Sequence, residues 1–425
     1  MKLSMQHRIK FTKSALGLLV LLSLGGCIGS DSSTSVGSNS NPSGGDGGVD
    51  EPAPVKGEVL TLQTGKTFSD AWNFGVHGGG NVGIGAQAAW NFHSLSECEG
   101  VTVAIIDTGT NDQHPQLGAQ LWENPDEIDG DGIDNDGNGL IDDFNGWNFI
   151  GSSESNLLRD DNGHGTHVAG VVAATGVHGT DLTGICAKVK IMTVKALNGD
   201  GLGSASDVIQ ALTYAVNEGA DIINLSLAFD GHIDDLYNLI KDHPKVLFVA
   251  AAGNNGKVLG AHNPEDAGFT ADLQKKYVYP ASYSHLPNLI SVASINQNAA
   301  LSGFSNLGSA VHITAPGDPI LSTGCESESS SVCGYYSMRG TSMATPHVAG
   351  SAAMFIGRFH PDLTNDSNMI SDTDAGIEVK NALLNTGTPY TFSSPLDGSN
   401  QTGSILNISN ILDADNLSTN ILDPN

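Results

Sequence analysis

The sequence predicts an α/β fold: a doubly wound, mostly parallel sheet with helices on both faces. Continuous apolar runs recur along the chain, as expected of strands that are buried on both faces of a parallel sheet. Helical patterns lie between these runs, and this alternation is typical of strand–helix–strand units. The 425-residue chain also contains 53 glycines, an excess that suits the many tight turns of such a fold.

Each expected element can be assigned to a stretch of sequence. Strands are expected in six apolar runs, at 101–109, 189–197, 221–229, 245–256, 288–295 and 310–317. Helices are expected at 163–175, 204–219 and 233–243, and from Ser342 onward. Ligands of doubly wound sheets bind at the carboxyl ends of the strands, so the functional site is expected there.

Residues 1–26 have the pattern of an export signal. Four basic residues come before an apolar run from Ala15 to Leu24, and two glycines then precede Cys27. The run is short for a bilayer span, which favours an export signal over a transmembrane anchor. The Leu-Gly-Gly-Cys ending resembles the lipobox of bacterial lipoproteins. That resemblance implies cleavage before Cys27, a lipid on its thiol, and an exported protein that is anchored to the outer membrane or cell surface, or released.

The rest of the chain divides by composition. Residues 27–56 are rich in Ser, Gly, Asp and Pro and offer little to bury, which predicts a flexible tether. One folded domain is expected over 57–413, with an acidic insertion at 126–149 and a short tail at 414–425.

The charge of the chain excludes some partners. The formal net charge is −28, and removal of residues 1–26 would leave 14 basic against 46 acidic residues. This balance argues against nucleic acid and anionic membrane surfaces as partners, so membrane contact is expected only through the lipid on Cys27. A well-solvated acidic surface would explain most of the charge, and calcium binding is compatible with it.

Four polar residues stand where the site is expected. Asp107 ends the first apolar run, Asn254 follows a later run, and His164 and Ser342 each open a helix. Each alone could be a turn or capping residue. Together they can supply a nucleophile, a general base, an orienting carboxylate and an oxyanion donor.

The segments around these residues resemble the signature blocks of the subtilisin-like serine proteases. The blocks are VAIIDTG around Asp107, NGHGTHVAG around His164, AAGNNG around Asn254 and GTSMATPHVAG around Ser342, in the family's order. The resemblance implies a serine endopeptidase that forms an acyl-enzyme on Ser342. His164 would be the base, Asp107 would orient it, and Asn254 would stabilise the oxyanion.

The resemblance extends from about residue 84 to about residue 412 and implies protein or peptide substrates, a monomer and no catalytic cofactor. A catalytically silent relative, acting as an acidic, calcium-loaded surface binding module, is the alternative from another class. The four filled catalytic positions argue against it. An esterase or peptide ligase on the same scaffold is left open by the sequence.

The resemblance also implies how an extended substrate is held, by main-chain pairing along two edge segments. The implied substrate-binding residues are Ser226, Leu227 and Ala228, then Ala252 and Gly253, and finally Val278 at the border of the pocket for the residue before the cut. Many relatives carry glycine where this chain has Val278, which predicts a shallower pocket.

The acidic insertion contains a candidate calcium loop. Read from its fourth aspartate, it follows the first nine positions of a calcium-binding loop, with the ligands Asp134, Asp136, Asn138, the Leu140 carbonyl and Asp142. Position twelve is Asn145 rather than glutamate, so a full EF-hand is not expected. We expect a structural Ca²⁺ ion, and an acidic Asn/Gly-rich turn is the alternative.

Four cysteines remain besides Cys27, an even number that favours disulfides in an exported protein. Three pairings are possible, and four free thiols are the alternative. In the subtilisin-like fold, the strands that follow Cys98 and Cys186 are implied to be parallel neighbours. The resemblance therefore implies a Cys98–Cys186 bridge, with a local Cys325–Cys333 bridge across CESESSSVC.

Overall fold

A computed structural model describes most of the chain from residue 98 onward and short pieces before it. The described residues are 19–21, 63, 70–74, 83–86, 89–90, 98–151, 155–176, 182–267, 269–272, 274–326, 332–359, 374–393 and 400–413. The expected cleavage site at Cys27, the tether and the C-terminal tail lie outside these ranges. Among the described helices, none has the length and apolar character needed to span a bilayer.

The described part of the chain contains a nine-stranded sheet in the order β12-β13-β9-β8-β7-β6-β2-β4-β3. All neighbours are parallel except the β12–β13 pair. The strands are β2 (Thr102–Asp107), β3 (Gly146–Asn148), β4 (Lys190–Lys195), β6 (Ile222–Leu225), β7 (Leu247–Ala251), β8 (Leu289–Asn296), β9 (Ile313–Asp318), β12 (Thr388–Ser393) and β13 (Asn400–Ile405). The predicted parallel sheet is confirmed, and all six expected runs contain a strand.

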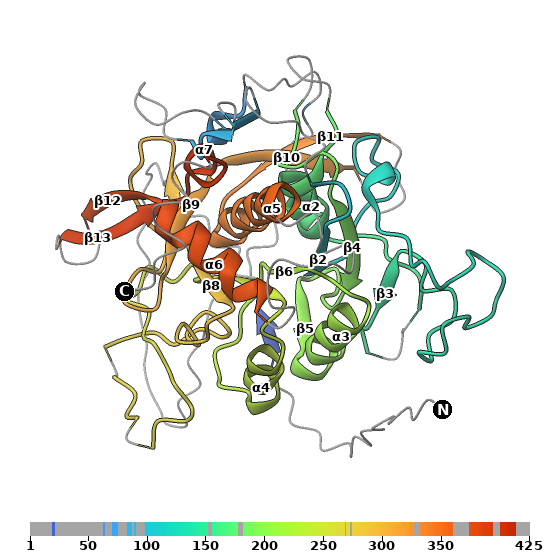
Figure 1. Cartoon of the computed structure of the whole chain (residues 1–425), viewed down its shortest axis with the longest axis horizontal. Helices are drawn as coiled ribbons and strands as arrows, with labels where there is room; N and C mark the ends of the chain where they lie inside the picture. The colour runs from blue at the N-terminus through green and yellow to red at the C-terminus, as the bar shows by residue number, and fades with distance from the viewer. Residues whose placement is uncertain are drawn as a thin grey trace, which may run out of the picture.

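Helices cover both faces of this sheet, as predicted (Figure 1). On one face lie α2 (His164–Ala173) and α5 (Thr341–Phe359), which contact each other, and on the other lie α3 (Ala205–Asn217) and α4 (Asp234–Asp242). Near the C-terminus, α6 (Ala375–Thr386) packs on β7 and β8, and the short α7 (Ile408–Ile411) packs on α6.

The side chains of β2 show why this strand is apolar throughout. Val103 and Ile105 belong to the core beneath α2 and α5, whereas Ala104 and Ile106 belong to the core beneath α3 and α4. Since successive side chains of a strand point to opposite faces, a strand between two helix layers has no polar face. Asp107 is the first charged residue of β2, and it stands at the carboxyl end of the strand.

Two smaller pairings lie outside the main sheet. β10 (Ile320–Cys325) and β11 (Cys333–Met338) form an antiparallel hairpin. β5 (Leu202–Ser204), which leads into α3, pairs antiparallel with β1 (Leu19–Leu21). Neither pairing was predicted from the sequence.

Both expected disulfides are confirmed. Cys98–Cys186 joins the segments that lead into β2 and β4, with 6.3 Å between the Cα atoms. Cys325–Cys333 closes the hairpin that ends just before α5, with 4.0 Å between the Cα atoms.

Candidate active site

The predicted site residues meet at the carboxyl ends of three neighbouring strands. Asp107 is the last residue of β2, Ser226 follows β6, and Asn254 follows β7. β6 lies between β2 and β7 in the sheet. α2 begins at His164, and Ser342 is the second residue of α5.

Asp107 and His164 form a buried hydrogen-bonded pair. His164 Nδ1 lies 2.7 Å from Asp107 Oδ1, which also accepts a bond from the Thr108 N–H, and both side chains are fully buried. Burial would lower the pKa of His164, but the charge and hydrogen bond of Asp107 together with the charge of Asp160 outweigh it, and the pKa is raised above the ordinary imidazole value. Such a pair fixes the imidazole with Nε2 on the side away from the carboxylate.

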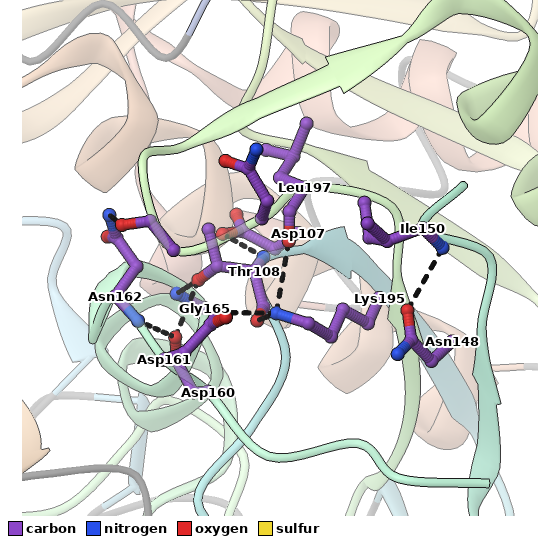
Figure 2. Close-up of polar contacts among 12 residues, drawn as sticks. Asp107, Thr108, Asn148, Ile150, Asp160, Asp161, Asn162, Gly165, Lys195 and Leu197 are labelled. Atoms are coloured by element: carbon purple, nitrogen blue, oxygen red, sulfur yellow. Dashed lines mark hydrogen bonds and ion pairs between the residues drawn. The ribbon is translucent and has the colours of Figure 1, made fainter. Parts of the chain in front are cut away.

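The loop before His164 is held by a second carboxylate, Asp160, which is 4% exposed. Its Oδ1 accepts bonds from the Thr108 hydroxyl and from the N–H groups of Asn162 and Gly163. Its Oδ2 accepts bonds from the N–H and the hydroxyl of Thr166. Asp160 therefore ties Thr108, which follows β2, to the first turn of α2 (Figure 2).

A buried lysine completes this network (Figure 2). Lys195, at the end of β4, donates to the Thr108 carbonyl, to the Leu197 carbonyl at 3.1 Å and to Asp161 Oδ1 at 2.6 Å. Only 5% of Lys195 is exposed, so its charge needs these partners. It holds the backbone that follows Asp107.

Ser342 is linked to Ser226 by two reciprocal bonds. The Ser342 hydroxyl donates to the Ser226 carbonyl at 3.1 Å, and the Ser226 hydroxyl donates to the Ser342 carbonyl at 2.8 Å. The Asn224 amide in turn donates to the Ser226 hydroxyl at 2.9 Å. These bonds hold the start of α5 against the end of β6.

His164 Nε2 is buried, and within the described part of the chain it has no hydrogen-bond partner. The Ser342 hydroxyl therefore occupies a conformation in which it bonds to backbone rather than to the imidazole. Catalytic hydrogen bonds are often absent or long until substrate is bound.

Asn254 is fixed by the residue before Ser342. Its Oδ1 accepts bonds from both the N–H and the hydroxyl of Thr341, at 2.9 and 3.0 Å. Two donors on one oxygen settle the orientation of the amide, so Nδ2 points to the other side. The amide hydrogens are thus presented beside the N-terminus of α5.

Comparison with known proteins decides the family. The profile of the Subtilase family matches residues 98–406. The chain belongs to the Subtilase family. It is 34% identical to "Thermitase" of Thermoactinomyces vulgaris over 309 residues, which cover 72% of this chain and 88% of that protein.

Further relatives agree with this result. The chain is 33% identical to "Intracellular serine protease" of Paenibacillus polymyxa, over 64% of this chain and 70% of that protein. A solved structure described as "Proteases from Pseudoalteromonas arctica" is 24% identical in sequence and superposes with a TM-score of 0.60. The match covers 81% of this chain and 97% of that chain, and it supports the fold. The predicted subtilisin-like serine endopeptidase, a hydrolase, is confirmed.

The implied substrate-binding segments of this subtilase follow β6 and β7, and Ser226 is bonded to Ser342. Gly253 has a φ of 93°, and a Cβ there would lie 2.7 Å from the Asn306 amide nitrogen and 3.4 Å from the Val278 side chain. Val278 is therefore packed against the 252–253 segment. Phe229, just after Ala228, exchanges two backbone bonds with Tyr279, just after Val278, so the first edge segment and the expected pocket border are joined.

Backbone N–H groups of the acidic insertion bond to the carboxylates expected as calcium ligands. Asp134 accepts bonds from the N–H groups of Gly137 and Gly139, and Asp136 accepts one from the Asn138 N–H. The Asp142 carboxylate instead accepts from the Gly132 N–H. Leu140 packs partly buried against the core beneath α3.

Carboxylates from outside the nine positions join the cluster. Glu127 lies with Asp134 and Asp136, and Asp143 lies with Asp136 and Glu218, all with ligand atoms within 4.8 Å of one another in each group. Sequence patterns did not indicate Glu218, because its proximity to the insertion arises only when α3 packs beside it.

Proposed function

We propose that this subtilase cleaves peptide bonds of proteins through an acyl-enzyme on Ser342. The observation that supports it best is the buried Asp107–His164 pair, whose Nε2 has no hydrogen-bond partner among the described residues, on a helix that packs against α5. Rotation about the Cα–Cβ bond would turn the Ser342 hydroxyl from the Ser226 carbonyl to Nε2. His164 would then accept the hydroxyl proton as the oxygen attacks the substrate carbonyl carbon.

The later steps use the same groups. The protonated His164, stabilised by Asp107, donates its proton to the leaving amine as the C–N bond breaks. A water molecule then loses its proton to His164 and hydrolyses the ester on Ser342. Asn254 Nδ2, oriented by Thr341, donates to the oxyanion in both stages, and the N-terminus of α5 adds positive potential there.

We propose that substrate binds as an extended strand against Ser226, Leu227 and Ala228, with Ala252, Gly253 and Val278 around the residue before the cut. The backbone bonds between Phe229 and Tyr279 support this mode, because they hold the segment after Ser226 beside the segment after Val278. The buried Val278 beside Gly253 supports a shallow pocket that favours small residues.

We also propose that the protein is exported, loses residues 1–26 and is anchored to the cell envelope through a lipid on Cys27. A structural Ca²⁺ ion would belong to the acidic insertion, for which the expected ligands were Asp134, Asp136, Asn138, the Leu140 carbonyl and Asp142. The donors there are oxygens, which suit a hard cation.

Two matched substitutions test the chemistry. Ser342→Ala should abolish both labelling by a fluorophosphonate probe and hydrolysis of casein, with an unchanged far-UV circular dichroism spectrum. Asn254→Ala should retain labelling while kcat falls by roughly 100- to 1,000-fold, the cost of one oxyanion donor. A wild-type protein that is folded but resists the probe would instead identify a silent binding module.

A further inference from the structure

Arg339 is a basic residue close to the catalytic serine, and the proposed chemistry gives it no role. It stands three residues before Ser342 and is the only arginine or lysine between Cys333 and Gly357. In a chain with a formal net charge of −28, a cation at this place is a local exception. The side chain of Arg339 is 53% exposed, so its charge is accessible to a bound molecule.

Two contacts hold this arginine in place. Its Nε lies 3.2 Å from Oδ1 of Asp318, the last residue of β9. The next residue, Gly340, donates its N–H to the Gly317 carbonyl at 3.0 Å. A guanidinium group has five N–H donors, and a bidentate carboxylate engages two of them. Donors of Arg339 therefore remain for a second carboxylate.

The backbone at Arg339 borders the place of the reacting carbonyl. A Cβ on Gly340 would lie 3.4 Å from Asn254 Nδ2, the proposed oxyanion donor. The Cα atoms of Arg339 and Gly340 are consecutive and thus about 3.8 Å apart. An extended substrate advances about 3.3 Å per residue. Substrate residues one or two positions from the scissile bond therefore come within reach of a long side chain at position 339.

The packing of the β10–β11 hairpin indicates which side of the scissile bond Arg339 faces. Arg339 directly follows β11, and the hairpin packs on α2, the helix that begins at His164 (Figure 1). The Thr323 hydroxyl of β10, for example, donates to the Thr166 carbonyl of α2 at 2.7 Å. His164 is the proposed proton donor to the leaving amine, whereas the residues before the cut are proposed to lie against segments that follow β6 and β7. Arg339 thus belongs with the elements of the leaving-group side.

We propose that Arg339 selects substrates that carry an aspartate or a glutamate within the first two residues after the cleaved bond. The Asp318 carboxylate holds the guanidinium group from one side, and the substrate carboxylate accepts bonds from the donors that remain. This selectivity rests on the proposed peptidase and adds a substrate class to it. An exposed ion pair contributes modestly, so the expected preference is about two- to fivefold.

The test uses quenched fluorogenic peptides that carry either glutamate or glutamine at one position, from the third residue before the cut to the third residue after it. Mass spectrometry identifies the cleaved bond. For the parent chain, kcat/KM should be about two- to fivefold higher with glutamate than with glutamine at the first or second position after the cut. The difference should lie mainly in KM, because the ion pair forms in the ground state as well as in the transition state.

Two further measurements on the parent chain separate this contact from a general charge effect. Glutamate at the positions before the cut should give no such advantage over glutamine. In about 1 M NaCl the preference after the cut should fall toward a ratio of one, because exposed charges are screened. Both measurements are made on the parent, so they do not depend on whether a variant folds.

Substitutions of the arginine assign the preference to it. Arg339→Gln should bring the glutamate-to-glutamine ratio of kcat/KM to about one, Arg339→Lys should retain part of the preference, and Arg339→Glu should reverse it. Arg358→Gln is the matched control. Arg358 lies in the last turn of α5, about 25 Å from the start of that helix, and its loss should leave the parent's ratio unchanged.

Other results would overturn this assignment. If the parent cleaves both peptides equally, or if its preference survives in Arg339→Gln, the arginine serves only as the partner of Asp318. A lower melting temperature of Arg339→Gln with an unchanged ratio would show that structural role directly. If the fluorophosphonate probe labels Ser342 but the ratio is one, the peptidase stands and only the selectivity fails. If the parent is neither labelled nor active, both fail.

Discussion

The loop before His164 and the acidic insertion each bury a carboxylate, but the hydrogen-bond donors around the two carboxylates differ. Asp160 receives five hydrogen bonds shared between its two oxygens. Asp143 keeps one buried oxygen that has no donor among the described residues, and Asp136 and Glu218 bring further carboxylates close to it.

The difference indicates two roles for a buried carboxylate. A carboxylate surrounded by N–H and O–H donors is a structural element, because the donors stabilise its charge in place of water. A carboxylate that lacks donors and faces other carboxylates is stabilised either by a proton, as the raised pKa of Asp143 indicates, or by a cation. Burial alone does not distinguish the two; the donors do.

The largest effect is expected from a substitution of Asp160, which accepts five hydrogen bonds in the loop before His164. Asp160→Asn replaces two accepting oxygens with one, and turns an NH₂ group toward donors from Thr108, Asn162 and Gly163 or from Thr166. We expect the free energy of unfolding to fall by about 2–3 kcal/mol, measured by urea denaturation in the Ser342→Ala background. In the otherwise wild-type chain, kcat should also fall, because Asp160 positions the loop before His164.

Asp200→Asn is the matched control for that prediction. Asp200 is exposed on the turn before β5, and its described contact is made through its backbone N–H. Its free energy of unfolding should change by less than about 0.5 kcal/mol. Equal losses in the two variants would mean that the bonds to Asp160 are not what stabilises the loop.

The sequence predicted the candidate active site far better than the surroundings of the acidic insertion. Asp107, His164, Asn254 and Ser342 each stand in a local block whose strand or helix is set by neighbouring residues, so their placement follows once the parallel sheet is recognised. The disulfide between Cys98 and Cys186 followed from the implied adjacency of two strands.

Glu218 could not be found in that way. It belongs to an ordinary helix end, and its role arises from the packing of α3 beside the insertion. The strand β5 was missed for a similar reason: Leu-Gly-Ser has little strand propensity, and it becomes a strand by pairing with another segment. Asp142, in contrast, fitted the sequence spacing, but its carboxylate is bonded to the Gly132 N–H.

The second prediction concerns the protonation of His347 in α5, the helix that also contains Ser342. His347 of α5 is fully buried; its Nδ1 lies 2.8 Å from the Met343 carbonyl, and its Nε2 lies 2.8 Å from the Asn73 amide nitrogen. Burial lowers the pKa of His347 to about 4. The unfolded chain therefore binds a proton at this residue below about pH 6.5, before the folded chain does, and stability is lost as the pH falls toward 4.

His347→Gln isolates this contribution. The variant should be less stable than the parent at pH 7, but between pH 7 and pH 5.5 it should lose about 1 kcal/mol less stability than the parent loses. Urea denaturation at the two pH values, both in the Ser342→Ala background, measures the difference. Parallel losses in the two proteins would show that His347 is not held neutral.

The smallest expected effect is that of Glu218→Gln, which should stabilise the chain where Asp160→Asn destabilises it. Glu218→Gln is the same acid-to-amide change as Asp160→Asn, but in a chelator it should stabilise the chain by about 0.5 kcal/mol. Glu218 places a negative charge at the C-terminal, negative end of α3 and beside Asp136 and Asp143, and both interactions are unfavourable without a cation.

In saturating Ca²⁺ the same substitution should lower the melting temperature, because the folded chain binds the ion less tightly. Thermal melts of parent and variant under the two conditions give four values. A Glu218→Gln variant that is destabilised equally with chelator and with Ca²⁺ would mean that Glu218 serves as a structural acceptor like Asp160, and that the two regions do not differ in the way described.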